Sequence, residues 1–576
     1  MHWSSSLLCV VAASHSALAL WPIPTTLTTG TSFLVLSPTF SITVNVPNAP
    51  QDLLDAVSRT KHYLTTDNLQ RLVPDRGASD APSLKTAPVL PSLTISLQGS
   101  SASLPIASEA VKDFPNRPAL EAYTLAIPDS GAAAVLSANS TLGLFRGLTT
   151  FTQLWYTLGE TVYMNSAPVS ILKDAPAYPY RGFMLDTSRN FFPVADIKHT
   201  LDAMSWVKVL FLTYLTRVEP PTSQLNQFHW HVVDSQSFPL SLPEFPELAQ
   251  KGAYSAAQLY SPADVQDIAS YAAARGIDIV MEIDSPGHTD VIVNSHPEHV
   301  ACSEASPWTT FANEPPAGQL RLATPATVNF STALFKAAAG KIPGKYFSTG
   351  GDELNTACYA QDAQTQADLK KAGQTLEQAL GAFVQATHSA LASVGKSPVV
   401  WEEMVLDHNL KLSNNTVVMV WISSANAAAV AAKGYRFVHA PSDYFYLDCR
   451  AGEWIGNGPS SNSWCDPFKT WQHAYTFNPL ANISTAQAHL VLGGEQLLWT
   501  EQSDPSNLDP IVWPRAAVSA EVFWSAKQPN GKALSGVEAQ GRLHDVRFRM
   551  VQRGVRAVAL QPEWCAVRPG RCNWDS

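Results

Sequence analysis

Lys345-Tyr-Phe-Ser-Thr-Gly-Gly-Asp-Glu-Leu-Asn355 carries the strongest structural signal in this chain. A short β-type run ends in two glycines, and two carboxylates, Asp352 and Glu353, follow at once. Glycines let the backbone turn tightly and approach a ligand closely. Two adjacent acids cannot both ionise cheaply in a dry pocket, so we expect their pKa values to separate. Taken alone, the motif also fits a turn with two solvated acids, and the rest of the chain has to decide.

Strand and helix signals alternate along the chain after Tyr180. Helix signals are clearest at Ser261–Arg275, Thr327–Lys341 and Leu376–Val394. The strand candidates are Gly182–Asp186, Asn226–Asp234, Asp278–Asp284, Tyr346–Gly350, Val399–Met404, Val417–Ile422, Arg436–Ala440 and His489–Trp499. This pattern predicts an α/β fold, a (β/α)8 TIM barrel. An open doubly wound sheet is the alternative, but it favours a glycine-rich loop after its first strand, and residues 186–190 contain no glycine.

A barrel gathers its chemistry at one end, because active sites of barrel enzymes lie at the carboxyl ends of the strands. Acids, aromatic residues, histidines and an arginine accumulate at these predicted ends. The segments are Asp186–Arg189, His229–Asp234, Glu282–His288, Gly350–Glu353, Trp401–Glu403, Trp421, Asp443–Asp448 and Trp499–Glu501. One pocket is therefore expected there.

A small α+β domain is predicted to precede the barrel. Its strand signals are Leu93–Leu97, Ala122–Ile127 and Ala133–Ser137, and an amphipathic helix spans Gly143–Leu158. Residues 20 to about 100 are rich in Pro, Ser and Thr, and Ala81–Leu90 is typical of a linker. We therefore place the small domain at residues 91–175 and the barrel, with a disulfide-closed tail, at residues 176–576.

The N-terminus and the cysteines indicate secretion. Leu7–Leu20 is mostly apolar, and a small-residue cleavage site at Ala17–Ala19 predicts a signal peptide over residues 1–19; a buried N-terminal helix is the alternative. Six cysteines then remain, and an even number fits disulfides in an oxidising compartment. We expect the pairs Cys302–Cys358, Cys449–Cys465 and Cys565–Cys572. Glycosylation sequons stand at Asn139, Asn329, Asn414 and Asn482.

Charge and hydropathy exclude two kinds of partner. The formal net charge is −10 and the basic residues are scattered, which argues against nucleic acid or an anionic membrane surface. No segment after the N-terminal one is apolar over the roughly 18 residues that a membrane span needs.

The residue types at the strand ends suit a sugar. Indole faces stack on sugar rings and carboxylates accept from hydroxyls, so Trp401, Trp421 and Trp499 could enclose one ring. One protonated and one charged carboxyl group are the equipment for cleaving a glycosidic bond. The alternative is a metal-dependent hydrolase, in which His229 and His231 bind the ion together with His288 or Asp234.

Several motifs, in order, resemble family-20 glycoside hydrolases, the β-N-acetylhexosaminidases. They are Arg181–Arg189, Phe228–Asp234, Ile283–Thr289, Gly350–Glu353 and Trp513–Ala516, and the match extends over Tyr178–Ala526. Residues 93–165 resemble the small N-terminal domain of that family. The sequence around Ser348–Asn355 resembles the secreted fungal branch, which carries a propeptide, so residues 20–90 could hold a propeptide and linker.

The resemblance implies an exo-acting enzyme that removes terminal GlcNAc or GalNAc from chitin oligomers and glycans. In that family the 2-acetamido oxygen of the substrate attacks, and an oxazolinium ion forms. Glu353 would be the general acid and base with a raised pKa, a charged Asp352 would hold the acetamido N–H, and Asp234 and His288 would extend Glu353 into a relay. Substrate binding would fall to Arg189, Trp401, Trp421, Tyr446, Asp448, Trp499 and Glu501. No metal or cofactor has a role, and the relatives often form homodimers.

Residues 209–224 depart from the family pattern. Without them, Met204–Lys208 would join Leu225–His231 in the order that the family shows. We interpret the segment as a translated intron, with a genuine surface insertion as the alternative; transcript sequencing across the junction distinguishes the two.

Overall fold

The C-terminal part of the chain is the predicted TIM barrel. The computed structural model describes residues 20–24, 26–99, 103–115, 117–206, 208–209, 223–408, 410–456 and 462–574. The parallel barrel is closed and consists of β7 (Tyr180–Asp186), β10 (Gln227–Val233), β11 (Asp278–Ile283), β14 (Tyr346–Ser348), β15 (Ser397–Trp401), β16 (Val417–Val420), β17 (Arg436–His439) and β18 (Val491–Leu498). Closure by β18 against β7, with Gly493 opposite Tyr180, rules out the open sheet.

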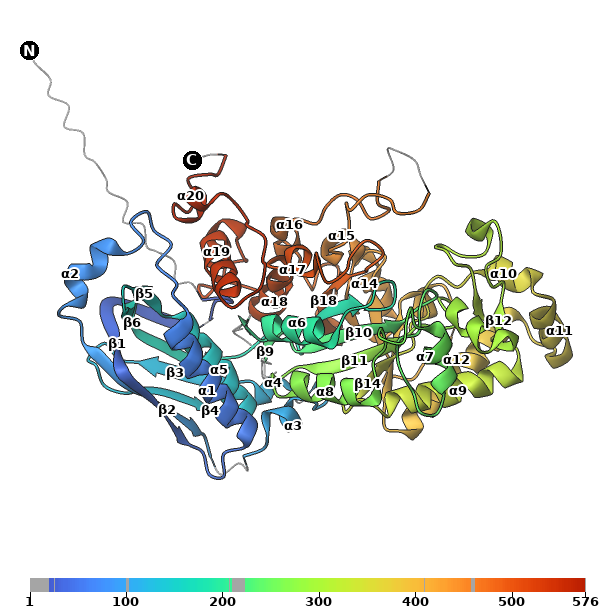
Figure 1. Ribbon diagram of the computed structural model, residues 1–576, viewed down its shortest axis with the longest axis horizontal. Helices are drawn as coiled ribbons and strands as arrows, with labels where there is room; N and C mark the ends of the chain where they lie inside the picture. The colour runs from blue at the N-terminus through green and yellow to red at the C-terminus, as the bar shows by residue number, and fades with distance from the viewer. Residues whose placement is uncertain are drawn as a thin grey trace, which may run out of the picture.

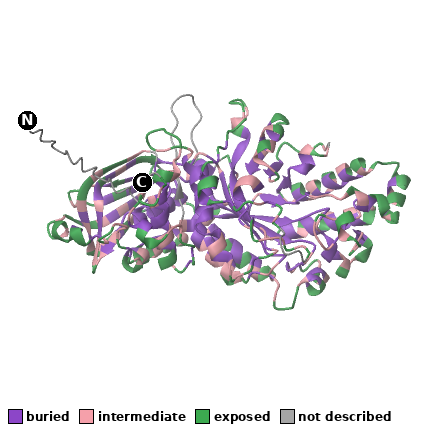
Figure 2. Ribbon diagram, turned by 90° about the horizontal axis from the view of Figure 1, so that it is seen from above, coloured by how far each residue is buried: buried purple, intermediate pink, exposed green. Residues whose placement is uncertain are grey.

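The barrel strands are buried on both faces, because side chains fill the interior and helices cover the outside. Every residue of β7, β10 and β11 is buried. Figure 2 shows buried residues gathered in the interior of the molecule and exposed residues at its outside. The covering helices include α6 (Val194–Trp206), α8 (Pro262–Ala273), α9 (Pro325–Ala339), α12 (Leu376–Ser393), α14 (Ala427–Ala432) and α18 (Arg515–Ser525). The helix α19 (Gly536–Gln552) packs on α18 through the ion pair of Arg542 with Glu521. Capping boxes at Ser261 and Thr375 start α8 and α12 within a few residues of the predicted helix starts.

The N-terminal domain begins earlier than predicted. Its sheet has the order β1-β2-β4-β3-β6-β5. The strands are β1 (Leu27–Asn45), β2 (Val89–Leu97), β3 (Tyr123–Ile127), β4 (Ala134–Ala138), β5 (Tyr156–Leu158) and β6 (Thr161–Asp174). Residues 20–90, predicted as propeptide and linker, supply β1, α1 (Gln51–Thr66) and the start of β2. The boundary at residue 91 was wrong because β1 pairs with both β2 and β6, which lie far away in the sequence.

Buried polar contacts join the two domains, which lie side by side in Figure 1. From α5 (Thr141–Gln153), Arg146 donates to Glu121 at 2.6 Å and to the carbonyl of Gly276, on the barrel, at 2.9 Å. A side chain at Gly276 (φ 71°) would overlap the Arg146 guanidinium. Trp21 is fully buried and its indole N–H donates to Ala517 of α18 at 2.9 Å. The small domain is thus fastened to the amino-terminal side of the barrel, away from the strand ends that carry the site.

Two predictions concern residues that are not described. The signal peptide, residues 1–19, lies outside the described part of the chain, and so does most of the 209–224 segment. The flanking residues form a two-stranded antiparallel ladder, β8 (Lys208–Val209) with β9 (Ser223–Gln224). This ladder precedes β10, at the end of the barrel opposite the predicted site. None of the described helices is both long and apolar enough to cross a membrane.

Candidate active site

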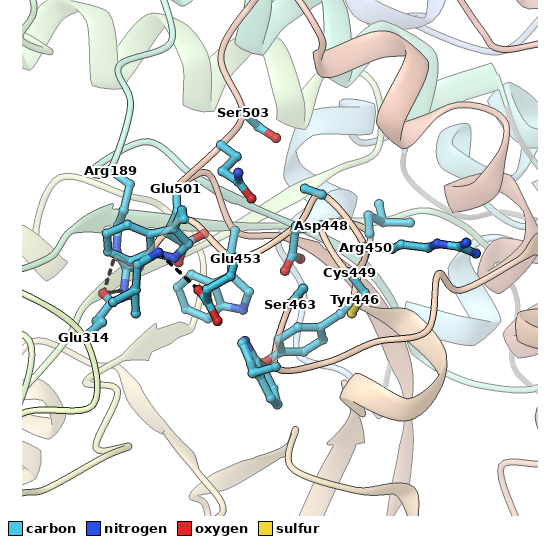
Figure 3. A pocket seen from close by; sticks show the side chains of 18 of the residues that line it. Arg189, Glu314, Tyr446, Asp448, Cys449, Arg450, Glu453, Ser463, Glu501 and Ser503 are labelled. Carbon is cyan, nitrogen blue, oxygen red and sulfur yellow. Dashed lines mark hydrogen bonds and ion pairs between the residues drawn. The ribbon is translucent and has the colours of Figure 1, made fainter. Parts of the chain in front are cut away.

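A cavity of about 570 Å³ opens at the carboxyl ends of the barrel strands. Predicted site residues from six different strand ends line it: Arg189, His288, Asp352, Glu353, Trp421, Tyr446, Asp448, Trp499 and Glu501. Figure 3 shows Arg189, Glu314 and Glu501 on one side of it and Tyr446 and Asp448 on another. The closed barrel brings these groups together because all its strands are parallel and end on one face.

Two predicted residues lie behind the cavity wall. Trp401 is the last residue of β15, points into the barrel and is fully buried, with its ring centre 6.2 Å from that of Trp499. It therefore supports the aromatic wall instead of lining the cavity, which corrects the predicted cage of three tryptophans to two. Asp234 is also fully buried and reaches the cavity only through His288 and Arg189.

The turn that carries the acid pair depends on its two glycines. Gly350 (φ 66°) and Gly351 (φ 106°) have left-handed backbone conformations, which favour glycine. A side chain at Gly350 would overlap Asp284, and one at Gly351 would overlap Met404. Glu353 follows with φ 54°, an unusual conformation for a residue with a side chain. The turn thus delivers both Asp352 and Glu353 into the same cavity.

A hydrogen-bonded relay runs from Glu353 into the barrel. His288 Nε2 lies 3.3 Å from Glu353 Oε2, and His288 Nδ1 lies 3.1 Å from Asp234 Oδ1. Arg189 is an ion-pair partner of Asp234 at 3.0 Å. Burial lowers the pKa of His288, but the charge of Asp234 and the hydrogen bonds to Asp234 and Glu353 outweigh it and hold this pKa well above its ordinary value. In the free site His288 therefore carries a proton beside Glu353.

In the free site the pKa values of the two acids shift in directions opposite to those predicted. Burial and the neighbouring charge of Asp284 raise the pKa of Asp352 well above its ordinary value. Burial alone would raise the pKa of Glu353 too, but the hydrogen bond and charge of His288 outweigh it and lower that pKa. The prediction was wrong here because the decisive neighbours, Asp284 and His288, lie on another strand end.

Both ring nitrogens of His229 and of His231, the histidines of the metal alternative, contact carboxylates. His229 contacts Glu495 at 2.9 Å and Glu282 at 3.1 Å, one with each ring nitrogen. His231 contacts Glu282 at 2.6 Å and Asp234 at 2.9 Å in the same way. Despite their burial, these acids raise the pKa values of His229 and His231 to about 10 and about 9. A metal ligand must be a neutral imidazole with a free nitrogen, so the geometry does not support this alternative.

Glu314 is a cavity residue that the sequence did not reveal. It lies in an irregular loop, away from the strand ends, and accepts hydrogen bonds from the guanidinium of Arg189, including one from Nε at 3.1 Å. The Cys302–Cys358 disulfide ties this loop to α10 (Thr356–Gln361), directly after the acid pair. Neither the loop nor Glu314 has a periodic signal, so only its proximity to Arg189 identifies it.

Residues 178–527 match the family described as Glycosyl hydrolase family 20, catalytic domain. This chain belongs to glycosyl hydrolase family 20. The N-terminal residues 20–154 match the family described as beta-acetyl hexosaminidase like, which agrees with a small domain that begins near residue 20.

Relatives of this family-20 enzyme include a beta-hexosaminidase of Arthroderma benhamiae, 34% identical over 79% of this chain and 74% of the relative. A chitooligosaccharidolytic beta-N-acetylglucosaminidase of Bombyx mori is also 34% identical, over 78% of this chain and 74% of the relative. Among solved structures, a Flavobacterium johnsoniae chitobiase has a TM-score of 0.70 at 25% identity, over 93% of this chain and 73% of that one.

The structure of this family-20 enzyme joins the six cysteines of its described residues as Cys302–Cys358, Cys449–Cys465 and Cys565–Cys572, as predicted. The asparagines of all four sequons are exposed: Asn139, Asn329, Asn414 and Asn482. Glycosylation of these side chains stays a prediction.

Glu314→Ala is expected to raise KM for an N-acetylglucosaminide by about tenfold, since hydrogen bonds to charged groups contribute roughly 1.5–3 kcal/mol. Without Glu314, Arg189 loses one of its carboxylate partners and keeps Asp186 and Asp234. Steady-state kinetics of the variant test this. Glu304→Ala is the matched control, because Glu304 is exposed on the same loop. Equal KM values for the two variants would contradict a role for Glu314.

Proposed function

We propose that this enzyme is an exo-acting β-N-acetylhexosaminidase that releases terminal GlcNAc or GalNAc with retention of configuration. The observation that carries the proposal is the pair Asp352 and Glu353, adjacent in the chain and facing one cavity with Trp421, Tyr446 and Trp499 in its wall. Aromatic faces hold the sugar, and the two acids act on different parts of it. The names of the fungal and insect relatives support this substrate class.

In the first half of the proposed reaction, the acetamido carbonyl oxygen of the sugar attacks C1. Glu353 protonates the glycosidic oxygen as the C1–O bond breaks, and Asp352 accepts a hydrogen bond from the acetamido N–H. Tyr446 orients the acetamido oxygen. In the second half, Glu353 takes a proton from water, and this water attacks C1 and reopens the oxazolinium ring. The leaving alcohol and the water bind to the same face of the sugar, so configuration is retained.

In this proposal, substrate binding favours the protonated form of Glu353 and the charged form of Asp352. A sugar that fills the cavity excludes water from Glu353, which favours the protonated form of this carboxyl group. His288, whose Nε2 lies 3.3 Å from Glu353 Oε2, can supply that proton. The acetamido N–H donates to Asp352 and favours its charged form. We infer that the proton shared by the Asp352 and Asp284 pair then rests on Asp284, whose pKa burial raises to about 7.

The remaining site residues bind the hydroxyl groups in this proposal. Arg189 donates to the 3- and 4-hydroxyls, and Asp448 and Glu501 accept from the 4- and 6-hydroxyls. Trp421 and Trp499 enclose the ring and the acetamido methyl, with Trp401 packed behind Trp499. We also propose secretion to the medium or cell wall, supported by the predicted signal peptide and the three disulfides. A homodimer is the oligomeric state to test by ultracentrifugation.

The test of the proposal is a substrate panel. Chromogenic β-glycosides of GlcNAc, GalNAc and glucose are compared on the purified enzyme, and product configuration is followed by NMR. We expect the N-acetylated glycosides to be cleaved far faster than the glucoside, with retention. Equal rates for the glucoside would refute substrate assistance, and loss of activity with a chelator would revive the metal alternative.

Asp284→Asn is expected to move the acidic limb of the kcat/KM profile to lower pH. Asp284 is a buried neighbour whose negative charge raises the pKa of Asp352. Removing that charge makes ionisation of Asp352 easier, so its pKa falls and the charged form persists to lower pH. A pH series of kcat/KM for wild type and variant measures the shift. A limb that moves to higher pH would contradict the coupling of these two acids.

A further inference from the structure

A short segment after β15 contacts two separate parts of the cavity. Trp421 follows β16, and its backbone N–H donates to Glu402 Oε2 at 3.0 Å. The indole Nε1–H of the same residue donates to Glu403 Oε2 at 2.9 Å. Two consecutive acids therefore hold one tryptophan at two points, and the second hydrogen bond restrains the rotation of the ring.

Both acids are buried, and desolvation of a carboxylate costs free energy. Glu402 is 0% exposed and Glu403 is 8% exposed. Among the described residues, neither forms an ion pair with Lys, Arg or His, although Asn426 donates to Glu402 at 2.5 Å. Burial raises the pKa of each to about 8. A buried carboxyl group without a cation destabilises a protein unless its hydrogen bonds offset the desolvation. Here those hydrogen bonds include the two from Trp421, so we infer that the two acids serve to hold this residue.

The same segment supports the acid turn. Met404, next to Glu403, packs against Gly351, where a Cβ atom would lie 2.6 Å from Met404 Cγ. The Trp421 ring is 6.3 Å from that of Tyr446, at an interplanar angle of 21°, and 5.8 Å from that of Trp464. The segment Glu402–Met404 therefore sets the distance between the aromatic wall and the turn that carries Asp352.

We propose that Glu403 is a positioning residue, which fixes the indole of Trp421 against the acetamido group of the bound sugar. This inference rests on the proposed function. An attacking group must be held in a near-attack geometry, and a displacement of about 1 Å can cost roughly 10²-fold in rate. A ring free to rotate about its side-chain torsions would let the acetamido group leave that geometry.

The experiment compares Glu403→Ala, Glu403→Gln, Trp421→Phe and the double variant Glu403→Ala with Trp421→Phe. Glu403→Ala is expected to lower kcat for an N-acetylglucosaminide by about 10–100-fold, with KM changed less. Glu403→Gln is expected to recover kcat to within about threefold of wild type, because its amide oxygen still accepts the indole N–H. Phenylalanine lacks that N–H, so the double variant should be no slower than Trp421→Phe alone.

Wild-type kcat in Glu403→Ala, a Glu403→Gln variant as slow as Glu403→Ala, or losses that multiply in the double variant would each overturn the inference. If Glu403→Ala does not fold, Glu403→Leu replaces it, since leucine keeps the volume and accepts no hydrogen bond.

Near-ultraviolet circular dichroism tests the hydrogen bond between Glu403 and the Trp421 indole without turnover. Glu403→Ala should change the tryptophan bands of the wild type but not those of Trp421→Phe. An unchanged spectrum in both backgrounds would overturn the inference. Turnover of the N-acetylglucosaminide by the wild type is measured first. A wild type without activity would contradict the proposed function, separately from the role inferred for Glu403.

Discussion

Glu353→Gln is expected to lower kcat for an N-acetylglucosaminide with an alkyl leaving group by about 10²–10⁴-fold, the range of general acid catalysis. The amide keeps the length of the side chain and its contact with His288. It has no acidic proton to give to the glycosidic oxygen and cannot take one from water. Both halves of the reaction therefore slow down, whereas the sugar still fills the cavity. Steady-state kinetics measure the loss, and calorimetry with GlcNAc measures binding.

The leaving group supplies an internal control for this prediction. A nitrophenolate leaves without protonation, so the first half of the reaction in Glu353→Gln should lose less with a nitrophenyl glycoside than with an alkyl glycoside. Pre-steady-state release of nitrophenol separates that half from the second. Equal losses for both leaving groups, or a wild-type rate, would show that Glu353 is not the acid.

Asp352→Asn is expected to lower kcat by about 10²-fold, the loss that misplacement of a reacting group by about 1 Å can cause. Asparagine has a similar shape and can still accept one hydrogen bond, but it carries no charge to stabilise the positive oxazolinium ion. It also removes one member of the buried pair with Asp284. Attack by the acetamido oxygen should suffer most, and the measurement is kcat for GlcNAc glycosides.

The matched comparison uses a substrate without the acetamido arm. Slow cleavage of the corresponding glucoside by wild type should be almost unaffected in Asp352→Asn, since no acetamido group needs holding. The ratio of the two rates should therefore fall by nearly the whole loss in kcat. A variant that loses both activities equally would assign Asp352 to the fold or to general electrostatics.

The order of the pKa values of Asp352 and Glu353 could not be predicted from the sequence. Adjacency of Asp352 and Glu353 indicates that their pKa values differ, but not which is higher. That order depends on Asp284 for one acid and on His288 for the other. Both neighbours follow β11 and lie 65 to 68 residues before the acids in the sequence, and a pKa responds to burial and charge through space.

The position of Glu314 and the surroundings of the Trp401 side chain could not be predicted from the sequence. Glu314 lies in a loop whose course is held by the Cys302–Cys358 disulfide, so no periodicity places it beside Arg189. Trp401 ends a strand like the other site residues, but its side chain is fully buried next to Trp499 and does not line the cavity. Its predicted place in the cavity wall was therefore wrong, although the strand itself was placed correctly.

The amino-acid sequence by itself determined the barrel and the set of residues at its active end. Buried strands and amphipathic helices have local periodicities, and a closed parallel barrel brings all strand ends to one face whatever the loops do. Only the tertiary structure decided which acid has the higher pKa, which tryptophans line the cavity, and that residues 20–90 belong to the first domain. Each of these depends on desolvation or pairing with segments distant in the chain, and those energies exist only once the chain has folded.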